Sequence, residues 1–274
     1  MARKSLENWM SVSFFLRHAS SIGKKYGEIN LHFRDGTDID AVNDPHLALA
    51  LLGYYYYSNL LDSCSYRDML LLKSVGEDIS KKMAMNFKTK DIEKGSTGGT
   101  FSFKEGILFA LIRKYRPDAI IETGVAQGVS SYTILSALDA NSKGELTSID
   151  LPNRNPTHYN YYDGTVDRVF TPQELTPGWL IPDRLKTRWT LRLGKSEEIL
   201  PMVDKTIEMF LHDSEHSYKN MTFEFDWAYL HLTNGGLLTS DDISWNMAFD
   251  DFIKKHSDMK RLLDDKQFGV AIKN

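Results

Sequence analysis

The sequence has few cysteines and no long apolar run. Cys64 is its single cysteine among 274 residues, which excludes an internal disulfide framework and a metal site built from cysteines alone, and fits a reducing compartment. The most apolar stretch, residues 47–61, is shorter than the ~20 residues that a membrane-spanning helix needs. We therefore expect a cytoplasmic protein without a membrane element, in which this stretch is a buried helix or a wall beside the substrate.

Basic residues are not in excess either. The chain has 33 Lys and Arg against 37 Asp and Glu, a net charge of -4, so it has no broad cationic surface for nucleic acid or anionic lipid. Its 42% hydrophobic and 26% charged residues are ordinary for a globular protein. We expect a small-molecule partner, with no nucleic acid and no membrane, and leave a homo-oligomer open.

The first 100 residues show helical rather than strand periodicity. Three candidate helices are separated by turn-rich segments at 34–38 and 43–45, and the helices fall at about 6–16, 47–61 and 69–85. Residues 95–100 are rich in glycine and threonine, a flexible composition that marks a boundary or a loop. We predict a helical accessory segment over residues 1–100 and a second domain over residues 101–274.

From residue 104 onward, short apolar runs alternate with helical patterns. The runs predict strands at 119–121, 146–149, 189–193, 207–211 and 236–240, and the helical patterns fall at 107–115, 129–138, 218–232 and 248–255. The Asn-Gly-Gly at 234–236 should end the third of these helices. Such alternation predicts an α/β, Rossmann-like, doubly wound and mostly parallel sheet. An antiparallel pair from residues 259–272, with its turn near 265–266, should close the sheet.

A glycine-containing turn follows the first predicted strand of this domain. Glu122 ends the strand, and a helix should begin near Val129. Gly124 can take backbone angles closed to other residues, and Gly128 would let a ligand approach the helix N-terminus. A purely structural turn would use the same glycines.

An acidic residue follows the next predicted strand. Asp150 is placed to accept both hydroxyls of a ribose, as in dinucleotide-binding folds. A surface aspartate capping a loop is the alternative, which the preceding glycine turn makes the weaker one.

These motifs, in this order, resemble class I S-adenosylmethionine-dependent methyltransferases over residues 101–274. The run from Glu122 to Gly128 looks like the family's first motif, with Ala126 in place of the middle glycine, as in catechol O-methyltransferase-like members. The resemblance continues through residues 148–151, 194–201, 212–218 and 235–242.

The resemblance implies S-adenosylmethionine as the cofactor and assigns it a set of binding residues. Leu151 would lie against the adenine, whose edge would meet Gly194 and Ser196, and Asp150 would bind the ribose. The methionine part would lie against Glu122, Gly124, Gln127, Gly128 and Ser131, and Asp213 would sit beside the transferable methyl group.

Acidic residues gather after the fourth and fifth predicted strands. Asp213, Asp241 and Asp242 would repel one another at one mouth unless protonated or bound to a cation, and oxygen ligands favour Mg²⁺. The pattern resembles metal-dependent O-methyltransferases of the catechol and macrolide-sugar types, which implies these three as metal ligands and His216 as the base. Asp241 and Asp242 capping the next helix, and His216 packed in the core, are the alternatives. His212 should be structural.

We therefore predict methyl transfer to a hydroxyl oxygen of a sugar or phenol, assisted by a divalent metal. The aromatic residues between 157 and 182, with Tyr54 to Tyr57, either line the acceptor pocket or pack within the fold. An NAD(P)-dependent oxidoreductase would share the glycines and Asp150 but would not explain the polar strand ends. A non-catalytic binding protein on the same fold is the second rival.

Overall fold

The computed structural model describes residues 29–32, 36, 38–42, 44–89, 101–151, 159–160, 166–167, 175–264 and 267–274. These residues fall into two compact units. The first takes its described residues from 29–81 and 101–114, and the second takes them from 82–89 and from 115 onward. Within these ranges, no helix combines the length and the apolar character that crossing a membrane requires.

The first unit contains helices and one β-hairpin. Its elements are β1 (Ile29–His32), β2 (Asp38–Val42), α2 (Pro45–Leu60), α3 (Tyr66–Thr89) and α4 (Phe103–Tyr115). Of α3, only the residues up to 81 belong to this unit. Asp44 caps α2 by accepting the His46 N–H at 2.8 Å. The helices predicted at 47–61 and 69–85 are confirmed. The expected helix at 6–16 and the boundary at 95–100 lie outside the described residues.

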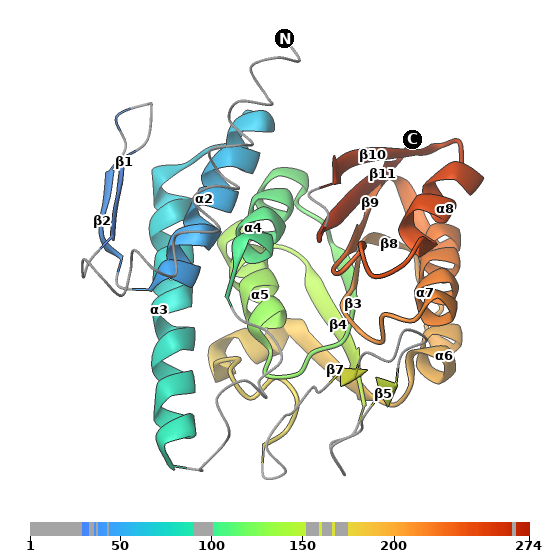
Figure 1. Ribbon diagram of the computed structural model, residues 1–274, viewed down its shortest axis with the longest axis horizontal. Coiled ribbons are helices and arrows are strands. Elements are labelled where there is room, and N and C mark those ends of the chain that lie inside the picture. The colour runs from blue at the N-terminus through green and yellow to red at the C-terminus, as the bar shows by residue number, and fades with distance from the viewer. Residues whose placement is uncertain are drawn as a thin grey trace. The chain divides into compact units, whose positions relative to one another are not determined.

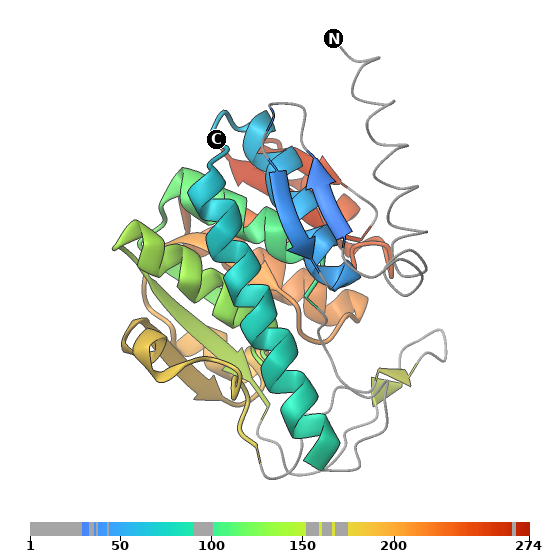
Figure 2. The ribbon, with the colours of Figure 1, turned by 90° about the vertical axis from the view of Figure 1, so that its left-hand side faces the viewer.

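This unit also contains a β-hairpin that the sequence did not predict. β1 and β2 pair antiparallel across the segment that the sequence marks only as turn-rich, and Figure 2 shows this hairpin beside α2. Leu31, Ile39 and Val42 of the hairpin are buried. Too few apolar and polar residues alternate here for a period of two to be recognised, so the sequence does not predict these strands.

The tyrosine run of α2 contributes to the core of the first unit. Tyr54 is fully buried, and its hydroxyl donates to Asp68 of α3 at 3.3 Å. Asp68 also accepts a 2.8 Å hydrogen bond from Arg113 of α4. Burial and the nearby Asp68 carboxylate raise the pKa of Tyr54 far above its usual range. Tyr54 therefore packs within the fold, which is one of the two roles that the sequence left open for the tyrosines at 54–57.

The second unit is built on one sheet, in which seven strands are seen among the described residues. Their order is β10-β11-β9-β8-β3-β4-β7 (Figure 1). The strands are β3 (Ala119–Thr123), β4 (Glu145–Asp150), β7 (Trp189–Leu193), β8 (Ile207–His212), β9 (Leu232–Ser240), β10 (Met259–Asp264) and β11 (Gly269–Lys273). Pairing is parallel except that β11 is antiparallel to both neighbours. The predicted Rossmann-like fold and its closing pair are confirmed.

Helices cover both faces of this sheet. α5 (Val129–Asn141) lies on one side, and α7 (Tyr218–His231) and α8 (Ala248–Lys255) lie on the other (Figure 1). Phe210 of β8, Phe225 of α7 and Phe249 of α8 belong to one buried cluster. Burying a side chain of this size stabilises the fold by about 1.5–3 kcal/mol. The central strands are apolar on both faces, as is usual for covered parallel sheets.

The end of α7 differs from the prediction. The helix ends at His231, and the Asn-Gly-Gly at 234–236 lies inside β9, where the pairing with β8 shifts register. Leu232 pairs with Ile207 and is buried, so strand pairing begins before the glycines are reached. The glycines accommodate the irregularity, and Gly235 has φ of +80°.

The strand order creates a switch point beside β3. The chain runs from β3 outward to β4 and β7, then returns to β8 on the other side of β3. The short elements between these strands are β5 (Tyr159–Asn160), β6 (Val166–Asp167), η1 (Asp183–Arg188), α6 (Ser196–Ile199) and η2 (Leu200–Met202). Ligands of open α/β sheets bind at the carboxyl ends of the strands beside such a switch point.

Candidate functional site

Strand pairing carries the predicted site residues to one edge of the sheet. Backbone hydrogen bonds just beyond the strands run from Gly194 N–H to the Asp150 carbonyl (2.8 Å) and from Asp241 N–H to the His212 carbonyl (2.9 Å). Between them, Gly124 N–H donates to the Ile149 carbonyl and Asp213 N–H to the Thr123 carbonyl, each at 2.9 Å. The order along the edge is therefore Gly194, Asp150, Gly124, Asp213 and Asp241. Gly124 and Asp213, which are 89 positions apart in the sequence, become neighbours there.

The turn after β3 is held by close backbone approaches. Gly124 has φ of +83°, and a Cβ built there would lie 1.9 Å from the Asp213 carbonyl oxygen. Gly128 has φ of +91°, and a Cβ there would lie 2.7 Å from the Gly178 Cα. Glycine is thus required at both positions by the packing of the chain itself. The segment around Gly178, rather than open space, faces Gly128.

Gln127 joins that segment to the turn. Its carbonyl accepts the Leu180 N–H at 3.1 Å, and its buried side chain accepts a hydrogen bond from the Trp179 indole. Gly178 N–H donates to the Ala126 carbonyl at 2.9 Å. Gln127 therefore fixes the conformation of the turn.

Asp150 braces the same turn from β4. One carboxylate oxygen accepts the N–H groups of Val125 and Ala126 at 3.1 and 2.8 Å, and the other accepts the Leu151 N–H at 2.7 Å. Burial raises the pKa of Asp150, although these N–H groups act in the opposite sense. A carboxylate has about four acceptor positions, so capacity for a further donor remains.

Glu122 and Ser131 lie behind the turn. Glu122 is fully buried, and its carboxylate accepts hydroxyl groups of Ser130 (2.6 Å), Ser131 (2.6 Å) and Ser148 (2.7 Å). Burial raises the pKa of Glu122 in spite of these three hydrogen bonds. These contacts join β3 to α5 and β4, and the predicted contact of Glu122 with a cofactor stays a prediction.

Apolar and polar surface meet beyond β4 and β7. Leu193 pairs with Asp150 in the sheet and is 48% exposed, and Leu151 is half-buried. Ser196 begins α6, and its hydroxyl donates to Asn220 at 3.2 Å. An apolar surface beside a half-buried carboxylate suits an adenosine, which joins an apolar base to a hydroxylated ribose.

A histidine beyond β8 lies beside one of the acidic residues that follow β9. His216 is 6% exposed, and its Nε2 atom lies 3.9 Å from Asp242 Oδ2. The ring centres of Trp245 and His212 are each 5.2 Å from that of His216. The helix-capping alternative for Asp241 and Asp242 is wrong, because α8 begins at Ala248 with Met247 at its N-cap.

The predicted metal ligands do not form a recognisable metal site. Among the residues with described positions, no three His, Cys, Asp or Glu side chains form a group that could hold a metal ion. The donor set of Asp213, Asp241 and Asp242 therefore does not fit a three-carboxylate site. The described geometry gives no support to the prediction that these residues bind a metal ion.

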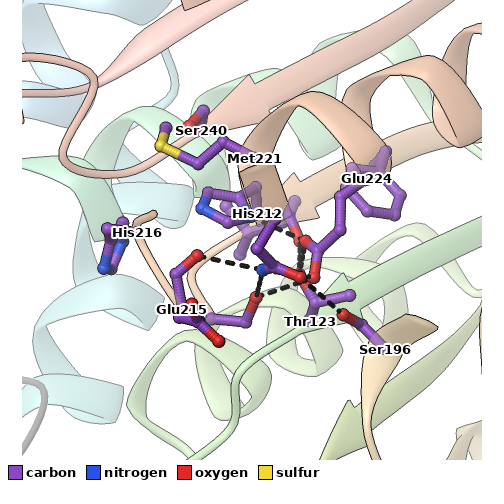
Figure 3. Close-up of polar contacts among 12 residues, drawn as sticks. Thr123, Ser196, His212, Glu215, His216, Met221, Glu224 and Ser240 are labelled. Carbon is purple, nitrogen blue, oxygen red and sulfur yellow. Dashed lines mark hydrogen bonds and ion pairs between the residues drawn. The ribbon is translucent and has the colours of Figure 1, made fainter. Parts of the chain in front are cut away.

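A buried ion pair beneath the strand ends was not predicted. Glu224 of α7 and His212 of β8 are both fully buried, with 2.6 Å between Glu224 Oε2 and His212 Nδ1 (Figure 3). Burial alone would raise the pKa of Glu224, but the charge of His212 and hydrogen bonds from His212, Ser196 and Thr123 bring that pKa below its ordinary value. From the sequence alone, Glu224 cannot be distinguished from the other polar residues of this helix. The structural role expected for His212 agrees with this contact.

The second unit is similar to known methyltransferases in sequence pattern and in fold. Residues 121–243 match a family described as a methyltransferase domain. The sheet is similar to that of the O-methyltransferase TomG from Streptomyces achromogenes, which is involved in tomaymycin synthesis and was solved with SAM (17% identity, 72% of this chain and 90% of that chain, TM-score 0.52). A proposed O-methyltransferase from Klebsiella pneumoniae is also similar (15% identity, 84% of this chain and 100% of that chain, TM-score 0.50).

At these identities, the solved structures show the fold alone. No curated protein matches the sequence. The matched family favours the methyltransferase prediction over the oxidoreductase alternative.

Glu122→Gln should make the protein more stable relative to the wild type as pH rises from about 5 to 7. Because burial raises the pKa of Glu122 above its ordinary value of 4.5, the folded wild type binds a proton more readily than the unfolded chain above that pH. Wild-type stability should then fall with rising pH, by up to about 1.4 kcal/mol per pH unit, whereas glutamine has no proton to lose. Urea unfolding of both proteins at several pH values measures the difference, and a pH-independent difference would contradict the assignment.

Proposed function

We propose that the chain is a class I S-adenosylmethionine-dependent methyltransferase and that a hydroxyl oxygen of a small molecule accepts the methyl group. The match of residues 121–243 to a methyltransferase domain supports this proposal. The observation that carries this proposal is the shared strand edge, where the turn at Gly124 and the carboxylate of Asp150 lie beside the segment that leads to His216. The net charge of -4 also argues against a nucleic-acid acceptor.

The chain's own residues suggest how the cofactor would be held. Asp150 would accept ribose hydroxyls while it braces the turn, and Leu151 and Leu193 would flank the adenine, with Gly194 and Ser196 at its edge. The methionine part would lie along the Gly124 turn toward Asp213. When bound, S-adenosylmethionine supplies a sulfonium methyl group that an oxygen nucleophile displaces, which leaves S-adenosylhomocysteine.

His216 is the base that this site offers. We assign its Nε2 atom the role of taking the proton of the acceptor hydroxyl, a step that contributes about 10²–10⁴-fold in rate in comparable enzymes. The Asp242 carboxylate at 3.9 Å stabilises the positive charge that the ring would gain. Trp245, 40% exposed beside His216, offers a flat apolar surface on which a sugar or phenol ring would pack.

Replacing Asp150 by alanine should weaken S-adenosylhomocysteine binding at least tenfold, because the ribose acceptor and the brace of the turn are both lost. Glu145→Ala is the matched control, since this exposed residue begins the same strand at its other end. Calorimetry with purified protein measures both constants. Unchanged affinity in Asp150→Ala would refute the ribose role, and tighter wild-type binding of NAD(P) than of S-adenosylhomocysteine would favour the oxidoreductase.

His216→Gln should reduce turnover about 100-fold, in line with loss of a general base, while S-adenosylhomocysteine affinity stays within twofold. His231→Gln provides the control, because His231 stacks on Trp227 at the opposite end of α7. Turnover is followed as S-adenosylhomocysteine release with a panel of sugars and phenols. Full activity would remove His216 as the base, and cofactor binding without turnover by the wild type would favour the non-catalytic rival.

A chelator should leave activity within about twofold of the untreated enzyme, because the described residues gather no group of three metal-binding side chains. The assay is repeated after dialysis against EDTA and again after addition of Mg²⁺. Loss of activity on chelation, with recovery on adding Mg²⁺, would instead support Asp213, Asp241 and Asp242 as ligands.

A further inference from the structure

Glu224 places a carboxyl group in the interior of the second unit. It lies in the middle of α7 and has no exposed surface. A buried charge costs several kcal/mol unless it is paired and hydrogen-bonded. The contacts that offset this cost at Glu224 therefore indicate what the residue holds in place.

Those contacts come from separate pieces of the chain at the strand ends. Glu224 Oε2 accepts the Thr123 hydroxyl at 2.5 Å and lies 2.6 Å from His212 Nδ1, and these two residues end β3 and β8. Glu224 Oε1 accepts the Ser214 hydroxyl at 2.7 Å and the Asn220 amide at 3.1 Å. Figure 3 shows the carboxylate between these groups.

A third piece of chain is reached through Asn220. The amide nitrogen of Asn220 donates to Glu224, and its amide oxygen accepts the hydroxyl of Ser196 at the start of α6. One carboxylate is thus connected to β3, β8 and α6. Thr123 precedes Gly124, and His212 and Ser214 flank Asp213, so these three contacts each lie within one residue of a predicted cofactor-binding residue.

We infer that Glu224 is a positioning residue of the cofactor site, which fixes the ends of β3 and β8 and the start of α6 relative to one another. The inference rests on the proposed function, because it assigns a purpose to the position of Gly124, Asp213 and Ser196. Binding sites require their groups to be held within about 0.5 Å. At Gly124 the spacing is already so tight that an added Cβ would lie 1.9 Å from the Asp213 carbonyl oxygen.

Glutamine at this position would break part of the arrangement. Its single oxygen can replace Oε2, which serves the Thr123 hydroxyl and His212. Its NH₂ group would then face the amide nitrogen of Asn220, where a donor meets a donor. Asn220 cannot turn its oxygen inward without losing the hydrogen bond that its amide nitrogen donates to the Glu215 carbonyl at 2.9 Å. The side chain keeps its size, so the change tests hydrogen bonding and charge rather than packing.

The test measures S-adenosylhomocysteine affinity of folded Glu224→Gln by calorimetry, well below the unfolding midpoint of each protein. We expect the dissociation constant to rise at least tenfold. Tyr229→Phe is the matched control, because it removes hydrogen bonds to Asp258 near the C-terminal end of the same helix. It should lower thermal stability but leave the dissociation constant for S-adenosylhomocysteine within twofold of the wild type.

Each possible outcome of these affinity measurements either supports or overturns the inference. An unchanged constant in Glu224→Gln, or an equal rise in both variants, would overturn the inference while the proposed function stands. Wild-type protein that does not bind S-adenosylhomocysteine would overturn the proposed function itself. Should Glu224→Gln not fold, Thr123→Val replaces it, because it removes one hydroxyl donor from the carboxylate at almost constant volume. A rise of at least threefold in that variant supports the inference, and no rise overturns it.

Discussion

Parallel pairing of β3 with β4 on one side and β8 on the other is the constraint on which the site depends. Parallel strands end at the same edge, so the turn after β3 and the segments after β4 and β8 must share one small region. The backbones approach so closely there that Gly124 has no room for a side chain beside Asp213. The glycine of the first motif is therefore explained by the sheet, before any ligand is considered.

Three carboxylates, of which Glu122 and Glu224 are buried and Asp150 is half-buried, stabilise this region in different ways. Glu122 is surrounded by serine hydroxyls, Asp150 by backbone N–H groups, and Glu224 by a histidine and hydroxyl or amide donors. Burial raises the pKa of the first two, whereas the charge and hydrogen bonds around Glu224 overcome that effect. The site is thus supported mainly by polar contacts that the chain makes with itself, and Asp150 is the one of the three beside which a ribose is expected.

Much of the second unit was predictable, because its strands are apolar on both faces and its helices are periodic. The strand ends at Asp150 and Asp213 followed directly from that alternation. The end of α7 did not, since the pairing of Leu232 with Ile207 is a tertiary contact that local glycines do not reveal. Glu224 was missed for the same reason: its partners lie on β3 and β8, and helix periodicity says nothing of them. The β1–β2 hairpin was too short to show a period.

The edge strands of the sheet affect whether copies of this protein associate with one another. In the described part of the chain, β10 and β7 are the edge strands, and each leaves one side of its backbone without a strand partner. Exposed Lys260 lies on β10 and exposed Arg192 on β7. Positive charges on edge strands oppose strand-to-strand addition between molecules. The charged residues on β7 and β10 thus protect the two edges of the sheet against aggregation, while the carboxyl ends of its strands form the candidate site.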